Sequence, residues 1–523
     1  MSNGPALLRD YVKADELEAA LAEYVGVQPE QVLATTGGDD AIDRILRHHL
    51  APGEELIVPV PTFEMIPAFA RMADAHLVPV EYEWGAFPVD EILGRVTSKT
   101  RVVVAISPDN PTGAAASAQA LTDLANALPA SALLLVDQAY IEFADEDPTS
   151  ALLALPNVLV VRTLSKAWGL AGLRVGYLVG PADRVRALRQ VGGPYAVSGI
   201  GASVALQRLR SGKARMWEFV AENKDRRERL TRLLAGLGGV VQPSQANFVL
   251  VRLAGAADVR QALESAGVLT RYFPALVDYL RITVPRSEQE FQRLAEALRT
   301  VLRPPALLFD MDGVLADVSG SYRVAIQETC ASYGVQVSGS DIARAKAGDN
   351  VNDDWALTRA LLLAAGAEAP LDEVTMRFEE RYQGTPDSPG LWRNERLIPD
   401  KERLTALSKE CPLGVVTGRP RQDAERFLQE EGIRDLFSVL VCREDAPLKP
   451  NPRPVSLAME KLGVHTAWFL GDTPDDIVAA QGAGALPVGV LAPGAGSEER
   501  EALEGAGAVQ VLPADKDLGG LLI

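Results

Sequence analysis

Thr163-Leu-Ser-Lys-Ala-Trp-Gly-Leu-Ala-Gly-Leu-Arg-Val-Gly-Tyr177 is the stretch that decides how the first part of this 523-residue chain folds. It begins where an apolar run, Val158–Arg162, ends, and it places Lys166 eight residues before Arg174. A lysine in this setting can form an imine with an aldehyde cofactor, and a hydroxyl and a guanidinium can bind the cofactor's phosphate. A lone lysine is usually a solvated surface residue, so the residues around it decide the interpretation.

Outward from this stretch, short apolar runs alternate with amphipathic segments. The periodicity of Gln119–Leu128 predicts a helix. The alternation is typical of an α/β domain with a mostly parallel sheet. The apolar runs that we expect to be buried strands are Glu55–Val60, Arg101–Ile106, Leu133–Val136 and Val158–Arg162.

Two changes of pattern divide the rest of the chain. Near residue 240 a smaller α+β region begins, with strands expected at Ala246–Arg252 and Tyr279–Val284 and a closing helix at Ser287–Leu302. Prolines 304 and 305 end that helix, because proline cannot continue it. We therefore predict a first domain at 1–302 and a second at 306–523.

The second domain is predicted to be another α/β unit. It opens with the apolar run Ala306–Phe309, and residues 320–410 have mainly helical patterns. The expected core is 306–318 and 400–523, with a helical cap inserted at about 319–399. Strands of the core are expected at Leu413–Thr417, Val439–Cys442 and Ala467–Leu470.

Composition excludes several classes of protein. A net charge of −18 argues against nucleic-acid and anionic-membrane partners, and no apolar run approaches the roughly 18 residues of a membrane span. The N-terminal residues have no pattern of an export signal, and the three cysteines have no metal or disulfide spacing. We expect a cytoplasmic protein that acts on small molecules.

Polar residues at strand ends support a cofactor site in the first domain. Asn110-Pro-Thr-Gly113 directly follows a predicted strand, and Asp137 ends another, with Tyr140 three residues later. A carboxylate at the C-terminal end of a parallel strand can keep a pyridine nitrogen protonated, and ligands of α/β proteins bind at that edge.

In this order, the motifs resemble those of the fold-type I pyridoxal-phosphate aminotransferases, in particular the histidinol-phosphate branch. The resemblance covers residues 1–302 and implies that Lys166 forms the imine with pyridoxal phosphate and carries a proton during the reaction. It implies that Arg281 grips the anionic end of the substrate. Arg271 is a second candidate, for a substrate phosphate, with a solvated surface arginine as the alternative.

The resemblance also assigns the cofactor's other contacts and implies a homodimer. Tyr11 would reach the cofactor phosphate of a neighbouring subunit, although the arm before it is shorter than usual in the family. The pyridine ring would be held by Phe63, Asn110, Asp137 and Tyr140, and the phosphate by Gly38, Asp39, Thr163, Ser165 and Arg174.

A second constellation follows in the second domain. Asp310 and Asp312 come after a buried strand, where two acids repel one another unless a cation binds, and Mg²⁺ fits oxygen ligands best. Further polar residues follow later strands and should meet at the same sheet edge. They are Thr417, Lys449, Asp472 and Asp476.

This set resembles the haloacid dehalogenase-like phosphatases over roughly 306–523. The resemblance implies that Asp310 attacks phosphorus and that Asp312 first protonates the leaving alcohol and then activates water. Thr417 and Lys449 would hold the phosphoryl group. Asp310, the backbone of Asp312, Asp472 and Asp476 would hold Mg²⁺. In the cap, Trp355, Arg377 and Arg381 are candidates for substrate selection, with ordinary packing as the alternative.

Together the two resemblances imply a bifunctional enzyme. Transamination of imidazole-acetol phosphate with glutamate and dephosphorylation of histidinol phosphate are consecutive steps, so one chain could carry out both. An aspartate nucleophile also allows a dehalogenase, but Asp312, as an acid, favours phosphate esters. Two alternatives remain open. The substrate could be another aromatic or phosphorylated amino acid with a phosphatase of different specificity, or one half could be a non-catalytic module.

Overall fold

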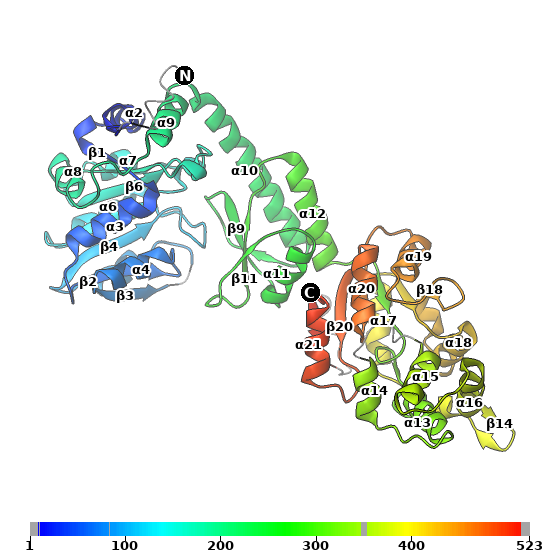
Figure 1. Cartoon of the computed structure of the whole chain (residues 1–523). Coiled ribbons are helices and arrows are strands. Elements are labelled where there is room, and N and C mark those ends of the chain that lie inside the picture. Colours follow the sequence, from blue (N-terminus) through cyan, green and yellow to red (C-terminus); the bar gives the residue numbers. More distant parts are fainter. Residues whose placement is uncertain (1–8, 10, 83, 347–352, 514–523) are drawn as a thin grey trace. The chain divides into compact units, whose positions relative to one another are not determined.

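The structure, a computed structural model, describes residues 9, 11–82, 84–346 and 353–513. The chain forms two compact units (Figure 1). Unit 1 runs to Arg252 and includes Arg271–Arg293, and unit 2 consists of Leu253–Thr270 and the residues from Leu294 onward. The domain boundary at residues 302–306 stays a prediction from the motifs.

Unit 1 is built on a large, mostly parallel sheet, as expected. The strands are hydrogen-bonded in the order β1-β7-β6-β5-β4-β2-β3, and only the pairs that involve β7 are antiparallel among the described strands. The strands are β1 (Val32–Thr35), β2 (Glu55–Val60), β3 (His76–Glu81), β4 (Thr100–Ile106), β5 (Leu133–Asp137), β6 (Val158–Thr163) and β7 (Gly176–Val179).

Both faces of this sheet are covered, because successive side chains of its central strands enter different cores. On β4, Val102 and Val104 pack with residues of α3 and α4, whereas Val103 and Ala105 pack with α5 and α6. Such two-sided burial explains why the strands are continuous apolar runs. The helices are α2 (Asp15–Val25), α3 (Gly37–His49), α4 (Met65–Met72), α5 (Val89–Leu93), α6 (Ala118–Ala127), α7 (Thr149–Leu152), α8 (Ala182–Arg189), α9 (Gly199–Ser211) and α10 (Lys213–Gly236).

A small antiparallel sheet in the order β10-β11-β9-β8 follows the long helix α10. In this sheet Arg271 of β10 lies directly opposite Arg281 of β11. The expected strands and closing helix are present, with ends that differ by one or two residues. The elements are β8 (Val240–Val241), β9 (Phe248–Arg252), α11 (Ala256–Ser265), β10 (Arg271–Tyr272), β11 (Tyr279–Thr283) and α12 (Glu288–Leu302).

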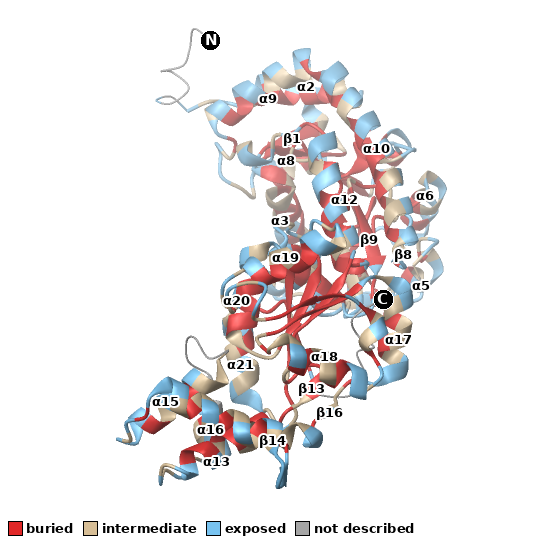
Figure 2. Ribbon diagram, turned by 90° about the vertical axis from the view of Figure 1, so that its right-hand side faces the viewer, coloured by how far each residue is buried: buried red, intermediate tan, exposed pale blue. Residues whose placement is uncertain are grey.

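Unit 2 contains a parallel sheet in the order β18-β17-β12-β19-β20-β21. Buried residues are concentrated on these strands, and exposed ones on the outer faces of the helices (Figure 2). Its strands are β12 (Leu307–Phe309), β17 (Leu413–Val416), β18 (Phe437–Val441), β19 (Trp468–Gly471), β20 (Leu486–Val490) and β21 (Gln510–Leu512). Its core helices are α17 (Lys401–Glu410), α18 (Arg421–Glu430), α19 (Arg453–Leu462), α20 (Pro474–Ala483) and α21 (Ser497–Gly505).

The inserted segment is a mainly helical cap, as the pattern predicts. Its core includes the neighbouring rings of Tyr322, Phe378 and Tyr382. The chain enters and leaves the cap through the short antiparallel pair β13 (Ala316–Asp317) and β16 (Arg396–Leu397). A small hairpin, β14 (Gly384–Thr385) with β15 (Ser388–Pro389), was not expected. The cap helices are α13 (Tyr322–Ala331), α14 (Gly339–Lys346), α15 (Asp354–Ala364) and α16 (Leu371–Gln383).

Among the described residues, no helix is both long enough and apolar enough to cross a bilayer.

Candidate active sites

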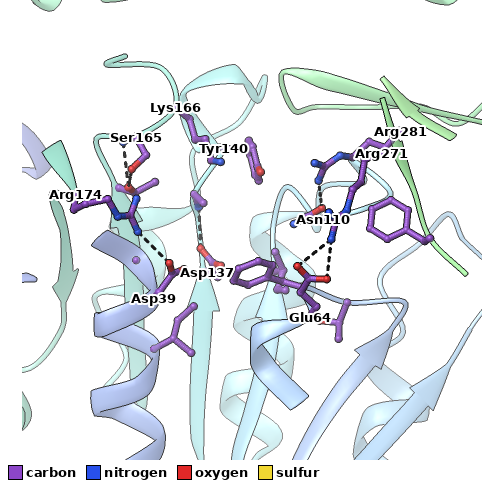
Figure 3. Close-up of a pocket in the computed structure, with 18 residues that line it drawn as sticks. Asp39, Glu64, Asn110, Asp137, Tyr140, Ser165, Lys166, Arg174, Arg271 and Arg281 are labelled. Carbon is purple, nitrogen blue, oxygen red and sulfur yellow. Dashed lines mark hydrogen bonds and ion pairs between the residues drawn. The ribbon is translucent and has the colours of Figure 1, made fainter. Parts of the chain in front are cut away.

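The carboxyl ends of β4, β5 and β6 border a cavity of about 400 Å³ in unit 1 (Figure 3). These strands are parallel neighbours, so the loops that follow them meet at one edge of the sheet. The structure brings together every site residue predicted for this region except Tyr11. The predicted residues that line the cavity are Gly38, Asp39, Phe63, Asn110, Asp137, Tyr140, Thr163, Ser165, Lys166, Arg174, Arg271 and Arg281.

One end of the cavity collects hydrogen-bond donors. Helix α3 begins there at Gly37, whose φ of +81° suits glycine. Nη2 of Arg174 lies 3.1 Å from Oδ2 of Asp39. The hydroxyl of Thr163 donates to Oγ of Ser165 at 2.9 Å. The N-terminus of a helix, two hydroxyls and a guanidinium therefore line the same end of the cavity, and donors of this kind suit an anion.

The floor of the cavity holds a buried carboxylate. Asp137 ends β5 and accepts a hydrogen bond from the backbone N–H of Ala139 at 3.0 Å. Burial raises its pKa to about 7, because the ionised form loses solvation that one backbone donor does not replace. A cation placed above this carboxylate would be strongly favoured.

Lys166 and Tyr140 project into the middle of the cavity. Nζ of Lys166 lies 5.1 Å from the centre of the Tyr140 ring (Figure 3). Lys166 lies three residues after the end of β6, and its carbonyl accepts a hydrogen bond from the backbone N–H of Gly169, which closes the turn after the strand. The amine is thus carried on a short loop at the sheet edge.

Two arginines from the small sheet form the other end of the cavity. Arg281 donates a hydrogen bond to Oδ1 of Asn110, and its guanidinium lies over the rings of Phe248 and Phe273. Burial lowers the pKa of Arg281 from its ordinary value. Arg271 is more exposed, and its Nη2 lies 3.0 Å from Oε2 of Glu64, a lining residue that the sequence did not indicate.

Tyr11 lies away from these residues. Its side chain is 84% exposed, and its ring stacks on that of Tyr195 at 4.6 Å between centroids. Its assignment to a neighbouring subunit's site stays a prediction.

The second predicted constellation forms at the carboxyl edge of the sheet in unit 2. Asp310 follows β12, Thr417 follows β17, and Asp472 follows β19, and these strands are parallel neighbours. Lys449 comes from the loop after β18, and Asp476 lies in the first turn of α20. Residues of four motifs that are far apart in the sequence therefore lie together at one edge of the sheet.

Lys449 is the centre of that cluster. Its Nζ lies 2.7 Å from Oδ1 of Asp310 and 2.5 Å from Oδ1 of Asp476. Burial alone would lower the pKa of Lys449, but the two carboxylates raise it above its ordinary value. The other oxygen of Asp476 accepts hydrogen bonds from the backbone and hydroxyl of Thr473, which orients it at the start of α20.

Three carboxylates of the cluster face a common point. Asp310, Asp472 and Asp476 each offer an oxygen within 4.8 Å of the others. A Cβ at Gly313, which has a φ of +76°, would collide with the carboxylate of Asp472. Glycine at position 313 is therefore needed both for the turn after Asp312 and for the close approach of Asp472.

Asp312 has a different partner from these three carboxylates. Its Oδ1 accepts a hydrogen bond at 2.7 Å from Nε of Arg419, a residue that the sequence motifs did not single out. The side chain of Asp312 lies outside the three-carboxylate cluster found among the described residues. Metal binding through the backbone of Asp312 stays a prediction.

The cap candidates differ in their contacts. Arg377 bonds to Ser332 and Glu373, and Arg381 donates to the carbonyl of Arg377, so the contacts of both arginines are within the cap. Trp355 differs, because the guanidinium of the core residue Arg443 lies 4.1 Å from the centre of its ring. Of the three, Trp355 is thus the residue with a contact to the core.

Comparison with known families supports the division into two sites. Residues 3–298, more than half of the chain, match the model of the class I and II aminotransferases. The chain belongs to this family. The aminotransferase region is followed by a match to the haloacid dehalogenase-like hydrolases at residues 304–484. The expected fold classes are confirmed for both regions.

Individual relatives show how far the likeness extends. A histidinol-phosphate aminotransferase of Xylella fastidiosa (strain 9a5c) is 38% identical over 304 residues, which are 56% of this chain and 83% of that protein. A protein of Phytophthora nicotianae named imidazoleglycerol-phosphate dehydratase is 47% identical over 196 residues, 36% of this chain. The match spans less than half of that relative, 43% of its length.

A solved structure agrees with the aminotransferase fold. The histidinol-phosphate aminotransferase of Sinorhizobium meliloti, solved with pyridoxal 5′-phosphate, is 26% identical with a TM-score of 0.53. The likeness covers 57% of this chain and 85% of that one.

The unit 1 cavity of this aminotransferase fits pyridoxal phosphate, the cofactor that its family implies. Burial raises the pKa of Asp137, and a protonated ring nitrogen beside it would stabilise its ionised form. The donors at the start of α3 and the guanidinium of Arg174 suit a phosphate dianion. A Cβ added to Gly37 would come within 2.7 Å of that guanidinium, so glycine at this position allows Arg174 to lie close to the start of α3.

The three-carboxylate cluster of unit 2 fits a hard divalent cation. Two of the three acids, Asp310 and Asp476, form ion pairs with Lys449, and a divalent cation would offset the repulsion among the three carboxylates. Oxygen ligands at this spacing suit Mg²⁺, which also keeps several waters.

Proposed function

We propose that this chain is a bifunctional enzyme of histidine biosynthesis. Unit 1 would transfer an amino group from glutamate to imidazole-acetol phosphate, using pyridoxal phosphate and forming histidinol phosphate. Unit 2 would hydrolyse the phosphate ester of histidinol phosphate with Mg²⁺. One observation carries the proposal. A region 38% identical to a histidinol-phosphate aminotransferase over 304 residues is joined to a region that matches the haloacid dehalogenase-like hydrolases.

In the first reaction, pyridoxal phosphate supplies an aldehyde for imine formation and a ring that withdraws electrons from the substrate carbon. The amine of Lys166 is the group that removes the proton from that carbon and returns it, because it projects into the middle of the cavity. Asp137 holds the proton on the ring nitrogen.

Substrate orientation depends on the small sheet. Arg281 is buried among aromatic rings and hydrogen-bonded to Asn110, so its guanidinium is held in place to grip the carboxylate of glutamate or the anionic end of the phosphorylated substrate. Arg271, which pairs with Glu64 here, is the second cation available to an anionic group.

In the second reaction, a carboxylate oxygen of Asp310 forms a bond to phosphorus as the ester oxygen leaves. Asp312 gives a proton to that oxygen and then takes one from the water that hydrolyses the aspartyl-phosphate. Lys449 and Thr417 hold the transferring phosphoryl group. Mg²⁺ bound by Asp310, Asp472 and Asp476 would offset the charge of the phosphate.

We also propose that the enzyme is a homodimer, with Tyr11 reaching the partner's cofactor phosphate. Its exposed, stacked position leaves the ring available for such a contact.

The test is a coupled assay on the full-length protein. With imidazole-acetol phosphate, glutamate and Mg²⁺, it should form 2-oxoglutarate, histidinol and inorganic phosphate. Histidinol phosphate given alone should release phosphate. Transamination without phosphate release from histidinol phosphate would contradict the coupled function. A preference for aromatic or other amino donors, measured by cofactor absorbance, would show that unit 1 has another substrate.

A further inference from the structure

A buried arginine joins the second active site to the base of the cap. Arg419 lies two residues after Thr417 and is 2% exposed. Its Nε and Nη2 lie 2.7 and 2.5 Å from Oδ1 of Asp312. Its Nη1 lies 2.8 Å from Oε2 of Glu395, also buried. One guanidinium therefore bridges the acid proposed for catalysis and a second carboxylate outside the cluster that would hold the metal.

The surroundings of Arg419 hold its guanidinium in one orientation. The centres of the Tyr322 and Phe427 rings lie 4.9 and 5.6 Å from Cζ of Arg419. The hydroxyl of Tyr382 lies 3.4 Å from Nη1. A guanidinium is planar and its donors have fixed directions, so two carboxylates bound at different edges constrain each other's positions.

Glu395 belongs to the base of the cap. Its Oε1 accepts hydrogen bonds from the hydroxyls of Ser321 at 2.9 Å and Tyr382 at 3.0 Å. Ser321 immediately precedes α13, where the chain enters the cap, and Glu395 immediately precedes β16, where it returns. Glu395 therefore connects Arg419 to the segments where the chain enters and leaves the cap.

We propose that Arg419 is a positioning residue that aligns Asp312 for proton transfer to the leaving alcohol and ties this alignment to the base of the cap. The inference rests on the phosphatase function proposed above. Both contacts between Arg419 and Asp312 are to Oδ1 of Asp312, so Oδ2 of Asp312 is the oxygen that carries the proton. In the step concerned, an oxygen of Asp310 bonds to phosphorus, the phosphorus–ester oxygen bond breaks, and the proton from Oδ2 goes to the departing oxygen.

Substrates with different leaving groups distinguish a role in proton transfer from a general structural role. An alkyl alcohol is a poor leaving group and needs the proton, whereas p-nitrophenolate departs without it. A misplaced acid should therefore slow alkyl esters and spare p-nitrophenyl phosphate. The comparison uses kcat/KM, which covers the steps up to departure of the alcohol and excludes the later hydrolysis of the aspartyl-phosphate, in which Asp312 also acts.

The experiment uses full-length protein with Mg²⁺, and histidinol phosphate and p-nitrophenyl phosphate as substrates. Because general acid catalysis contributes about 10²–10⁴-fold, Arg419→Gln should lower kcat/KM for histidinol phosphate by roughly 30-fold or more and for p-nitrophenyl phosphate by less than about 3-fold. Arg419→Lys should give the same selectivity with a smaller loss, because one ammonium keeps the charge without the fork.

Arg426 provides a matched control. It is another core arginine at the cap boundary, with contacts to Gln383, Asp423 and the ring of Trp392, and it lies outside the proposed catalytic residues. Arg426→Gln should leave kcat/KM for both esters within about threefold of wild type, as expected for a residue that takes no part in proton transfer. The same ester-selective loss in Arg426→Gln would show that any disturbance of the cap boundary has this effect, and would overturn the proposal.

Removing Arg419 leaves Glu395 buried without its cation, which can destabilise the fold. Glu395→Gln is therefore measured as well, because it keeps the side-chain volume and the oxygen that Ser321 and Tyr382 contact. Glu395→Gln should also lower kcat/KM for histidinol phosphate more than for p-nitrophenyl phosphate, with a smaller loss than in Arg419→Gln. Equal losses for both esters in the Arg419 variants, or no selectivity in Glu395→Gln, would overturn the positioning role. A wild type that hydrolyses neither ester would instead contradict the proposed function, and the inference with it.

Discussion

The charged groups of the two candidate active sites are arranged differently. In unit 1 the charged groups stand around a cavity of about 400 Å³, and the buried carboxylate of Asp137 has only a backbone N–H as its described hydrogen-bond donor. In unit 2 the charges are in contact, with Lys449 within 2.7 Å of two carboxylates. A large cofactor would complete the first site, whereas a small ion and a transient phosphoryl group would suffice for the second. The two sites should therefore respond differently to the same perturbation.

Loss of the central reacting group is the strongest way to test whether the sites are independent. Lys166→Ala should lower transamination by at least about a thousandfold and leave phosphate release from histidinol phosphate unchanged. Asp310→Asn should have the reciprocal effect, because the amide is not a nucleophile. Both activities are measured on each purified variant. If either variant loses both activities while it stays folded, the two sites are coupled and the comparison fails.

Metal removal should affect unit 2 alone. Chelation of Mg²⁺ leaves the carboxylates of Asp310, Asp472 and Asp476 facing one another and an incoming phosphate dianion. Since a metal contributes several kcal/mol to such a step, phosphatase activity should fall by about 100-fold or more, and added Mg²⁺ should restore it. Transamination in the same chelator serves as the control. Phosphate release that persists in chelator would rule out the metal site.

The buried carboxylate of unit 1 predicts a pH effect on the protein without cofactor. The pKa of Asp137 is near 7 in the folded state and about 3.8 in a solvated chain, so its contribution to stability is present below pH 4 and is lost as the pH rises through 7. Asp137→Asn does not ionise. The melting temperature of the variant minus that of wild type should therefore be larger at pH 8 than at pH 5.

Added pyridoxal phosphate should favour wild type over Asp137→Asn, because a protonated ring nitrogen stabilises the ionised Asp137 carboxylate. At pH 8 the cofactor should raise the melting temperature of wild type more than that of Asp137→Asn. An equal rise in both proteins would remove Asp137 from the ring site.

The exposed ion pair at the rim of the cavity should have the smallest effect. Glu64 pairs with Arg271 and would compete with an anionic substrate for it, and exposed pairs are worth about 0–1 kcal/mol, so Glu64→Gln should lower KM for imidazole-acetol phosphate by up to about fivefold. Arg271→Gln should raise that KM by a similar factor, with kcat nearly unchanged in both variants. Steady-state kinetics with the keto substrate varied measure this. A higher KM in Glu64→Gln together with a lower KM in Arg271→Gln would exclude Arg271 as a substrate contact.

Local sequence patterns were sufficient for most of the framework. The predicted run Glu55–Val60 is β2 to the residue, and the helix expected at Ser287–Leu302 is α12 at Glu288–Leu302. Buried parallel strands are continuous apolar runs, and prolines end helices, so both signals are local. The small hairpin β14–β15 was missed because each of its strands has two residues, too few for a periodic pattern.

Residues that depend on contacts distant in sequence could not be predicted in the same way. Glu64 and Arg271 are 207 residues apart, and Glu64 had no signal beyond following Phe63. Arg419 had a partial signal, because it follows Thr417 within the same short motif. Nothing in that motif indicates that its guanidinium binds Asp312, 107 residues earlier, and Glu395, 24 residues earlier in the chain.

The sequence by itself determined the two fold classes and which residues gather at the sheet edges, because strand-end motifs carry their residues to the edge of a parallel sheet wherever that sheet forms. The tertiary structure decided which charges neutralise one another. It placed Asp137 beside a cavity, paired Lys449 with two acids, and put Asp312 on a guanidinium shared with the base of the cap. Burial and the distances between charges set these energies, and both arise only when segments far apart in the chain pack together.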